Sequence, residues 1–291
     1  MMRRGRLAGL IAVGAFLSLG ACASSMRQPD ARPPGPADAE RDLFDPIPRS
    51  VTAPGGARGG GNVQLVELVF DVVRMDFPPD EVRHARKIWN HVDELRVGAE
   101  LIPQLARNGV RIGAARDDAW PAIRAVVEVA GAQARRDQLV AQRGLPLMLQ
   151  LAAVEEGESI FCYQENNRLV GKTFFEGQKI LGIDYAFHPE LGGCTDLKVG
   201  FEVRHDRGEL TWERKGGIIE QVPAVDRYVF SEIDVLLTLN ADEFLVLGLS
   251  DQGENAYLLG SRFLTVEQSG GRYETVLCIT PRPVRTRAKI R

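Results

Sequence analysis

Hydrophobic patterns divide the chain after residue 61 into a mixed segment and an extended one. In residues 63–75 apolar side chains occupy both alternating sets of positions, and Glu67 and Asp71 interrupt only one set. This pattern predicts a strand inside a sheet. After Pro78 and Pro79 apolar residues recur at helical spacing with charges opposite, which predicts a helix that packs on the sheet. The apolar stripe of this helix consists of Val82, Ala85, Ile88, Trp89, Val92 and Leu95.

Two further helices and one strand complete the mixed segment. A second short helix ends at Asn108, where glycine follows, and residues 110–114 resume an extended apolar run. Asp117 or Asp118 is placed to cap a third helix. The order strand, helices, strand, helix predicts a small mixed α/β domain at residues 62–136.

Residues 145–285 show no helical period, and short β-branched runs alternate with turn signals. We expect hairpins with turns at residues 206–208, 240–243 and 270–271. This half is predicted to be an all-β sheet or sandwich of about eight strands. The fold class expected for the chain is therefore α+β, with a small α/β domain followed by an all-β domain.

The first twenty-one residues have the layout of a signal peptide. Positive charges at Arg3, Arg4 and Arg6 precede an apolar run over residues 7–19 that holds no charged side chain. A permanent transmembrane helix needs roughly 20 apolar residues to cross a ~30 Å hydrocarbon core, so this run is too short. We expect the leader to be cleaved.

The leader closes with Leu19-Gly20-Ala21-Cys22, which resembles the lipobox of bacterial lipoproteins. The resemblance implies cleavage before Cys22 and lipidation of its thiol and new amino terminus, with acyl chains such as palmitate. Each buried methylene contributes about 0.8 kcal/mol, so two or three chains anchor essentially permanently. Ala23, where an aspartate would imply the inner membrane, favours the outer membrane facing the periplasm. The alternative is a secreted protein with a chance cysteine near the cleavage site.

Residues 22–61 are rich in Pro, Gly, Ala, Asp and Arg. Such a segment buries too little apolar surface to offset its ordering entropy, so we interpret it as a flexible tether. At ~3.3 Å per residue it could extend over roughly 100 Å. The folded part could then stand well away from the lipid.

Charge and cysteine content narrow the possible partners. The net charge is −3, and acidic and basic residues are interspersed. The sequence therefore lacks the basic stripe of a nucleic-acid-binding protein.

Beyond Cys22 the chain has three further cysteines, Cys162, Cys194 and Cys278. An oxidising periplasm would allow one disulfide and leave one thiol, and three buried, unreactive cysteines are the alternative.

The sequence offers few residues for catalysis or metal binding. His188, Cys194 and His205 are six and eleven residues apart, whereas zinc ligands usually come in pairs two to four apart. His84 and His91 share one helix face, but charges between them indicate a solvated surface. Because no nucleotide-binding or nucleophile motif occurs either, we predict no catalytic residue, no metal and no cofactor.

A group of aromatic residues is expected in the core: Phe161, Tyr163, Phe174, Phe175, Tyr185 and Phe187.

Four segments resemble, in order, elements of the C-terminal domain of bacterial secretins, which form outer-membrane rings in secretion and pilus machines. They are residues 196–210, 242–249, 259–263 and 275–282, the last ending in Thr-Pro-Arg. Charged residues interrupt the apolar runs between residues 171 and 223. No strand predicted there therefore has the length and the apolar alternation of a strand that lines a membrane pore. The resemblance implies a secretin-like scaffold without a membrane gate.

These features predict a non-enzymatic envelope lipoprotein, held to the membrane through Cys22. Its secretin-like domain is expected to act in assembly, either with further copies of the chain as a homo-oligomer or with proteins of a secretion or pilus complex. No nucleic-acid partner is expected. The alternative is a periplasmic ligand-binding lipoprotein whose aromatic group lines a pocket.

Overall fold

A long strand pairing joins two segments from distant parts of the sequence. In the computed structural model, β1 (Val63–Phe77) runs antiparallel to β13 (Gly271–Ala288), from Val63 opposite Ala288 to Phe77 opposite Glu274. All of the described residues belong to one unit of the chain, residues 44–291. The structure describes residues 63–142, 144–165, 167–215, 217–251, 255–268 and 271–288.

The β1–β13 pair lies within a sheet, here called sheet A, that draws strands from both predicted domains. Its order is β2-β11-β13-β1-β3, and β12 also pairs with β13. The predicted ranges 62–136 and 145–285 therefore share one hydrogen-bonded sheet. Local periodicity indicates where strands are but not which strands pair. The further strands are β2 (Val110–Arg116), β3 (Gln133–Val140), β11 (Glu243–Leu249) and β12 (Thr265–Gln268).

Three helices follow the order that the sequence predicts, and two of them cover one face of sheet A. The side chains of α1 and α3 pack there around Phe77, Ile88 and Ile123. The first helix is shorter than expected: Leu95 is 69% exposed and lies beyond it, in a separate 3-10 segment. The helices are α1 (Val82–Ile88), α2 (Ile102–Arg107) and α3 (Trp120–Val129), with 3-10 segments at Pro79–Glu81, Trp89–His91, Glu94–Val97 and Asp117–Ala119.

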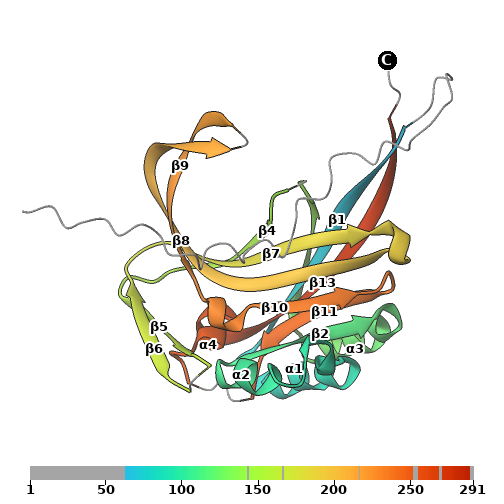
Figure 1. Cartoon of the computed structure of the whole chain (residues 1–291). Coiled ribbons are helices and arrows are strands. Elements are labelled where there is room, and N and C mark those ends of the chain that lie inside the picture. Colours follow the sequence, from blue (N-terminus) through green and yellow to red (C-terminus); the bar gives the residue numbers. More distant parts are fainter. Residues whose placement is uncertain are drawn as a thin grey trace, which may run out of the picture. The chain divides into compact units, whose positions relative to one another are not determined.

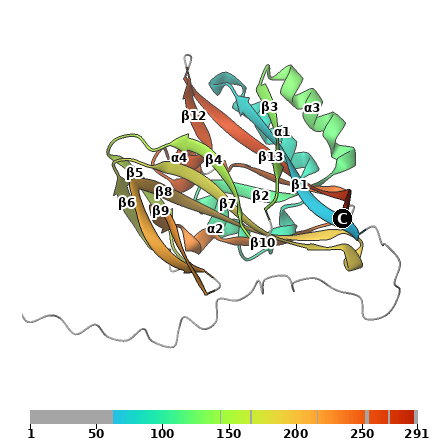
Figure 2. The same cartoon turned by 90° about the horizontal axis from the view of Figure 1, so that it is seen from above.

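A second sheet, here called sheet B, packs on the opposite face of sheet A. Phe70 and Val72 of β1 share a core there with Leu181 and Phe201 of sheet B. Figure 2 shows the resulting layers, with α1 and α3 on one side of β1 and β13 and with β7 and β8 on the other. Sheet B has the order β10-β8-β7-β4, with β9 pairing to β8, and is built from β4 (Leu147–Ala153), β7 (Gln178–His188), β8 (Cys194–Lys215), β9 (Ile218–Val229) and β10 (Val235–Leu239).

The second half of the chain is mostly β, with one short helix that the sequence did not indicate. Four of the five residues of this helix, α4 (Leu259–Phe263), are buried. Its five residues are too few for a helical period to stand out. A separate two-stranded sheet joins β5 (Glu158–Tyr163) to β6 (Leu169–Phe174), and 3-10 segments lie at Pro189–Leu191 and Ser231–Ile233.

The three predicted hairpins have different outcomes. The hairpin near residue 270 is confirmed by the pairing of β12 with β13. The prediction of a turn at residues 206–208 is wrong, because β8 continues through these positions and only its register with β9 shifts there. The hairpin around residues 240–243 is also wrong, because β10 pairs in sheet B while β11 pairs in sheet A.

A buried ion pair links the β5–β6 hairpin to sheet B. The Lys179 ammonium lies 2.9 Å and 3.0 Å from the two carboxylate oxygens of Glu158. Lys179 is 5% exposed and Glu158 is 4% exposed. A buried charge that loses its partner remains desolvated, so removal of one member of such a pair costs more free energy than the pair contributes.

We therefore expect Lys179→Met to lower the free energy of unfolding by about 3 kcal/mol or more. The double variant Lys179→Met with Glu158→Leu should lose less than the sum of the two single variants, because neither member of the pair is left facing the gap of the other. Urea denaturation followed by circular dichroism measures these values. Equal and additive losses of under about 1 kcal/mol in both single variants would contradict the assigned pair.

Candidate functional site

The residues assigned to export and anchoring lie outside the described part of the chain. The leader at residues 1–21, the lipidated Cys22 and the tether at residues 22–61 all fall there. They remain predictions from the sequence. Within the described residues, no helix combines the length and the apolar character needed to cross a membrane.

The three residues weighed as a metal site do not come together. His188 and Cys194 lie opposite each other where β7 meets β8. His205 lies eleven residues further along β8, which at ~3.3 Å per residue separates it by roughly 36 Å. His188 contacts Asp196 at 2.8 Å, and His205 contacts Glu176 at 3.1 Å. Among the described residues, no cluster of three or more His, Cys, Asp or Glu side chains is placed to hold a metal.

The three cysteines of the described part are separate free thiols. Cys162 and Cys278 are buried, while Cys194 is half-buried. Burial, together with the nearby Glu232 carboxylate, raises the pKa of Cys162 to about 12. Burial alone also raises the pKa of Cys278. Since the thiolate is the reactive form, these two buried groups are unreactive at neutral pH.

The aromatic side chains do not form one group around a cavity. Phe174 packs edge-on against Tyr228 at 5.6 Å between ring centroids, whereas Tyr185 packs against Phe70 at 5.2 Å. Phe161 faces Tyr257. Phe175 is 70% exposed, so the expectation that it belongs to the core is wrong. The rings occupy separate places and do not line a common pocket.

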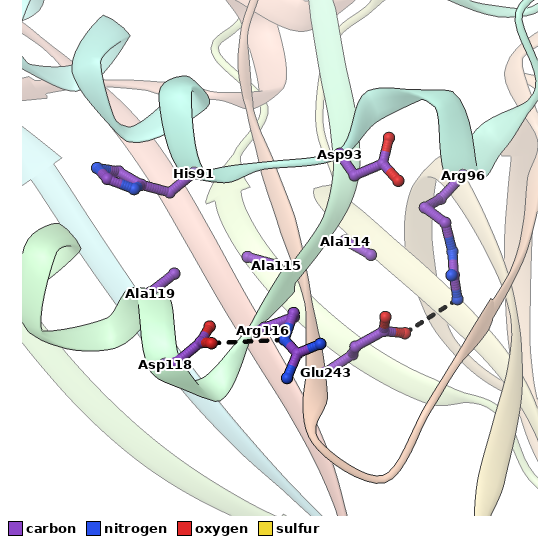
Figure 3. A pocket seen from close by; sticks show the side chains of 9 residues that line it. All are labelled: His91, Asp93, Arg96, Ala114, Ala115, Arg116, Asp118, Ala119 and Glu243. Atoms are coloured by element: carbon purple, nitrogen blue, oxygen red, sulfur yellow. Dashed lines mark hydrogen bonds and ion pairs between the residues drawn. The ribbon is translucent and has the colours of Figure 1, made fainter.

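A pocket of about 350 Å³ opens beside β2 (Figure 3). Alanines form its inner surface, and charged side chains surround its mouth. Arg96 is paired with Glu243 at 2.9 Å, and Arg116 lies 3.6 Å from Asp118. Asp93 accepts a hydrogen bond from the backbone of Leu95. Because these charges satisfy one another or the backbone, they do not converge on a point where a ligand would sit.

Most of the residues that carry the sequence resemblance lie in the core. Residues 275–282 lie in β13 and residues 242–249 include β11, its neighbour in sheet A. Phe263 of α4 packs edge-on against Phe201 of β8, with ring centroids 5.2 Å apart. These parts maintain the packing of sheet A against sheet B, whereas residues 205–210, at the end of the first segment, extend beyond the pairing of β8 with β7.

A two-stranded arm is the exposed feature of the described residues with the clearest potential as a contact surface. Strand β8 pairs with β7 only up to Arg204, and its remaining residues pair with β9 alone. Residues 205–226, here called the arm, therefore extend beyond the rest of sheet B. Figure 1 shows the arm in orange, bending away from the other strands.

One face of the arm carries three apolar side chains that are open to solvent. Leu210, Trp212 and Ile219 are 60%, 67% and 57% exposed. Trp212 lies two positions from Leu210, and Ile219 lies opposite Arg214 on the partner strand. Residues at alternate positions and directly opposite each other share a face of an antiparallel pair. The three side chains therefore share one face of the arm, here called its apolar face, together with Arg214 and with Gln221, which lies opposite Trp212.

Ion pairs fix the base of the arm. The Glu202 carboxylate is 2% exposed and contacts the guanidinium groups of both Arg204 on β8 and Arg227 on β9. Slightly further out, Arg207 donates a hydrogen bond to Asp226 at 2.8 Å, and this bond lowers the pKa of Asp226. Charge pairs thus link the two strands to each other at the base of the arm.

Sequence analysis missed the arm because a local signal suggested a different turn. Gly208 adopts a φ of 68° and its amide is bonded to Asp206, features shared with a tight turn. In the structure they produce only an irregularity within β8. The usable signal was the pair of glycines in the sequence at 216–217. The structure ends β8 at Lys215 and begins β9 at Ile218.

A buried carboxyl group lies on β13 beside a smaller pocket. Burial raises the pKa of Glu274 to about 7, with Asp251 raising it further and Arg86 and Arg111 opposing the shift. Asp251 and Arg111 also line the adjacent pocket of about 260 Å³. The group is therefore placed to bind a proton in the folded chain at pH values where the unfolded chain has released it.

This difference predicts how stability changes with pH. Glu274 ionises near pH 4.5 in the unfolded chain and near 7 in the folded chain, so its contribution to the free energy of unfolding falls as pH rises between these values. Glu274→Gln should be nearly neutral below pH 4.5 and should stabilise by up to about 3 kcal/mol above pH 7. Urea titrations at both ends of the window measure this. The exposed Glu267→Gln on β12 is the control, and a pH-independent effect of Glu274→Gln would contradict the assignment.

Comparison with known proteins gives only weak similarity. No protein-family model matches the sequence, and no curated protein matches it. Solved structures with some similarity are the InvG secretin domain of the Salmonella SPI-1 injectisome, at 11% identity and a TM-score of 0.20 over 78% of this chain, and the Salmonella type III secretion injectisome secretin InvG, at 12% identity and a TM-score of 0.20 over 78% of this chain. The chain covers 64% and 66% of those two chains.

Proposed function

We propose that this chain is a non-enzymatic envelope lipoprotein, anchored through Cys22, whose arm joins it to further copies of itself or to an outer-membrane secretion or pilus complex. The observation that carries the proposal is the arm itself, a paired but otherwise unsupported ribbon with an apolar face. The lipobox supplies the location, and the secretin-like sequence segments support the type of assembly.

Both edges of the arm are free of strand partners among the described residues. Beyond Arg204, β8 pairs only with β9, and β9 pairs only with β8. An isolated two-stranded hairpin is marginally stable in water, because it has neither a third strand nor a packed face. Free edges also present unpaired amide and carbonyl groups to other chains. A partner that supplies strands or a packing surface would stabilise the arm.

The side chains of the arm indicate what such a partner offers. Trp212 is the kind of aromatic anchor that dominates binding energy at protein interfaces, and Leu210 and Ile219 add apolar area beside it. On the other face, Glu213 lies directly opposite Glu220. Like charges in this position repel each other. A partner with an apolar groove and basic residues fits both faces.

The expected tether is compatible with this role. About 40 residues lie between the anchor and β1, and a chain of that length reaches roughly 30–40 Å on average and further when extended. The folded part can therefore meet a partner that stands away from the lipid surface. Anchoring confines the search for this partner to one membrane.

Substitution of the apolar face tests the proposal. The variant Leu210→Ser, Trp212→Ser, Ile219→Ser should weaken assembly at least about tenfold, because anchor residues contribute more than 1 kcal/mol each. Its free energy of unfolding should stay within about 1 kcal/mol of the wild type, since all three side chains are exposed. Light scattering of detergent-extracted protein and co-purification of envelope proteins provide the measurements.

A matched control replaces three equally apolar and exposed side chains elsewhere. The variant Leu95→Ser, Val129→Ser, Leu236→Ser removes exposed apolar side chains from a 3-10 segment, α3 and β10. It should leave assembly unchanged. A wild-type protein that is monomeric and copurifies with no envelope protein contradicts the proposal. So does an equal loss of assembly in both triple variants.

The anchor has its own test. In protein extracted from membranes, the mature wild-type chain should carry the mass of a diacylglyceryl group and an added acyl chain, as three-chain anchors require. Cys22→Ser should lack this mass, whereas Cys194→Ser should retain it. Intact-mass spectrometry distinguishes these outcomes. Lipid-free wild-type protein would overturn the anchoring assignment.

A further inference from the structure

Strand β8 has one edge that no other strand covers along the arm. Residues 194–204 pair with β7 on this edge, while β10 and then β9 pair on the opposite edge. Because β7 begins opposite Arg204, β8 continues past it with this edge free among the described residues. Residues 210–214 pair regularly with β9, and each of their side chains is exposed. This stretch of β8 is here called the free edge.

The outer edge of the arm on β9 is less suited to a further strand. Pro223 lies on β9 opposite Leu210. Proline has no amide hydrogen to donate to a strand ladder, and it protects strand edges against pairing. The free edge of β8 contains no proline and no glycine. A further strand is therefore expected on the β8 side of the arm.

A second copy of the same strand fits the free edge. Two copies of β8 related by a two-fold axis perpendicular to the sheet run antiparallel, and opposite residues then lie on the same face. With the axis at Trp212, Thr211 lies opposite Glu213 of the second copy, and Leu210 lies opposite its Arg214. Neither pair brings like charges together.

The neighbouring registers do bring like charges together. An axis at Thr211 would place Glu209 opposite Glu213, and an axis at Glu213 would place this residue opposite its own copy. Like charges directly opposite each other destabilise an antiparallel pair. Within the arm, Glu213 already lies opposite Glu220, so a further carboxylate would add to an existing repulsion. Charge therefore favours the register centred on Trp212.

This register also pairs side chains that gain from contact. The two Trp212 rings lie beside each other at the axis, and aromatic pairs between neighbouring strands are favourable. The Thr211 hydroxyl can donate a hydrogen bond to the Glu213 carboxylate of the second copy. Leu210 meets the methylene groups of Arg214. Four strands with an apolar face, in the order β9-β8-β8-β9, replace two ribbons that are each marginally stable alone.

We propose that two copies of this chain pair along residues 210–214 of β8, as an antiparallel dimer with Trp212 on its two-fold axis. This inference rests on the proposed function, because it names a second copy as one partner of the arm. It adds a defined register and a closed symmetry. The axis keeps both apolar faces on one side of the joined sheet, where they form a larger surface for an envelope protein.

Disulfide formation between mixed variants tests the register in the full lipidated chain. Thr211→Cys and Glu213→Cys are prepared separately, each with Cys194→Ser, because the remaining Cys162 and Cys278 are buried. Directly opposite side chains have Cβ atoms about 4.5–5.5 Å apart, whereas diagonal ones are about 7–8 Å apart. Oxidation of the mixture should give at least about threefold more cross-linked dimer than either variant alone, since only opposite cysteines come within disulfide reach.

The matched control places the same cysteine spacing on β9, as a mixture of Glu220→Cys with Val222→Cys. These positions face the same side of the arm but lie away from the second copy, so this mixture should show no increase. Equal cross-linking in the two mixtures, or in Thr211→Cys protein by itself, overturns the proposal. The double variant Thr211→Cys, Glu213→Cys should stop at dimers, and a ladder of larger species would contradict the closed symmetry.

The same samples separate this inference from the proposed function. Copurification of an envelope protein without the register-specific cross-link would remove the dimer and leave the proposed function standing. Cross-linked dimers that copurify with no envelope protein would support the second copy as the partner. Intact-mass spectrometry reports the lipid on Cys22 independently, so failure of the anchor is distinguishable from failure of the pairing.

Discussion

The backbone pairing of β1 with β13 is the interaction on which the rest of the described fold depends. It joins strands more than 190 positions apart in sequence and places them in the middle of sheet A. One side of the pair supports the helices through Met75 and Phe77, and the other packs on sheet B through Phe70 and Val72. Both cores therefore form only when the two ends of the described chain meet. In such non-local pairing, the entropy cost of closing the loop comes before the packing contacts that offset it.

The surface with a proposed role lies where this two-sided pairing stops. The arm leaves sheet B after Arg204, where β8 loses β7 as a neighbour and keeps β9 alone. Its exposed side chains include Leu210, Trp212 and Ile219 on one face. We infer that this face meets protein.

Local sequence signals predicted the elements well and their pairing poorly. The period of residues 63–75 identified a buried strand, and the stripe containing Ile88 identified a helix, because each pattern appears within one element. Gly208 was misread as a turn because its conformation is shared by turns and strand irregularities. The exposure of the arm could not be deduced, because it depends on β7 beginning at Gln178, opposite Arg204. The role of Cys22 rests on sequence alone.

Hydrogen–deuterium exchange of residues 205–226 tests the central claim about the arm most directly. The protein is compared in isolated envelopes and after detergent extraction and dilution. Residues 195–199 of β8, which are paired with both β7 and β10, are the internal reference. Our account predicts slow exchange in the arm within the envelope and fast exchange after dilution, while the reference segment stays protected in both. Equal exchange of the arm in the two states would contradict it.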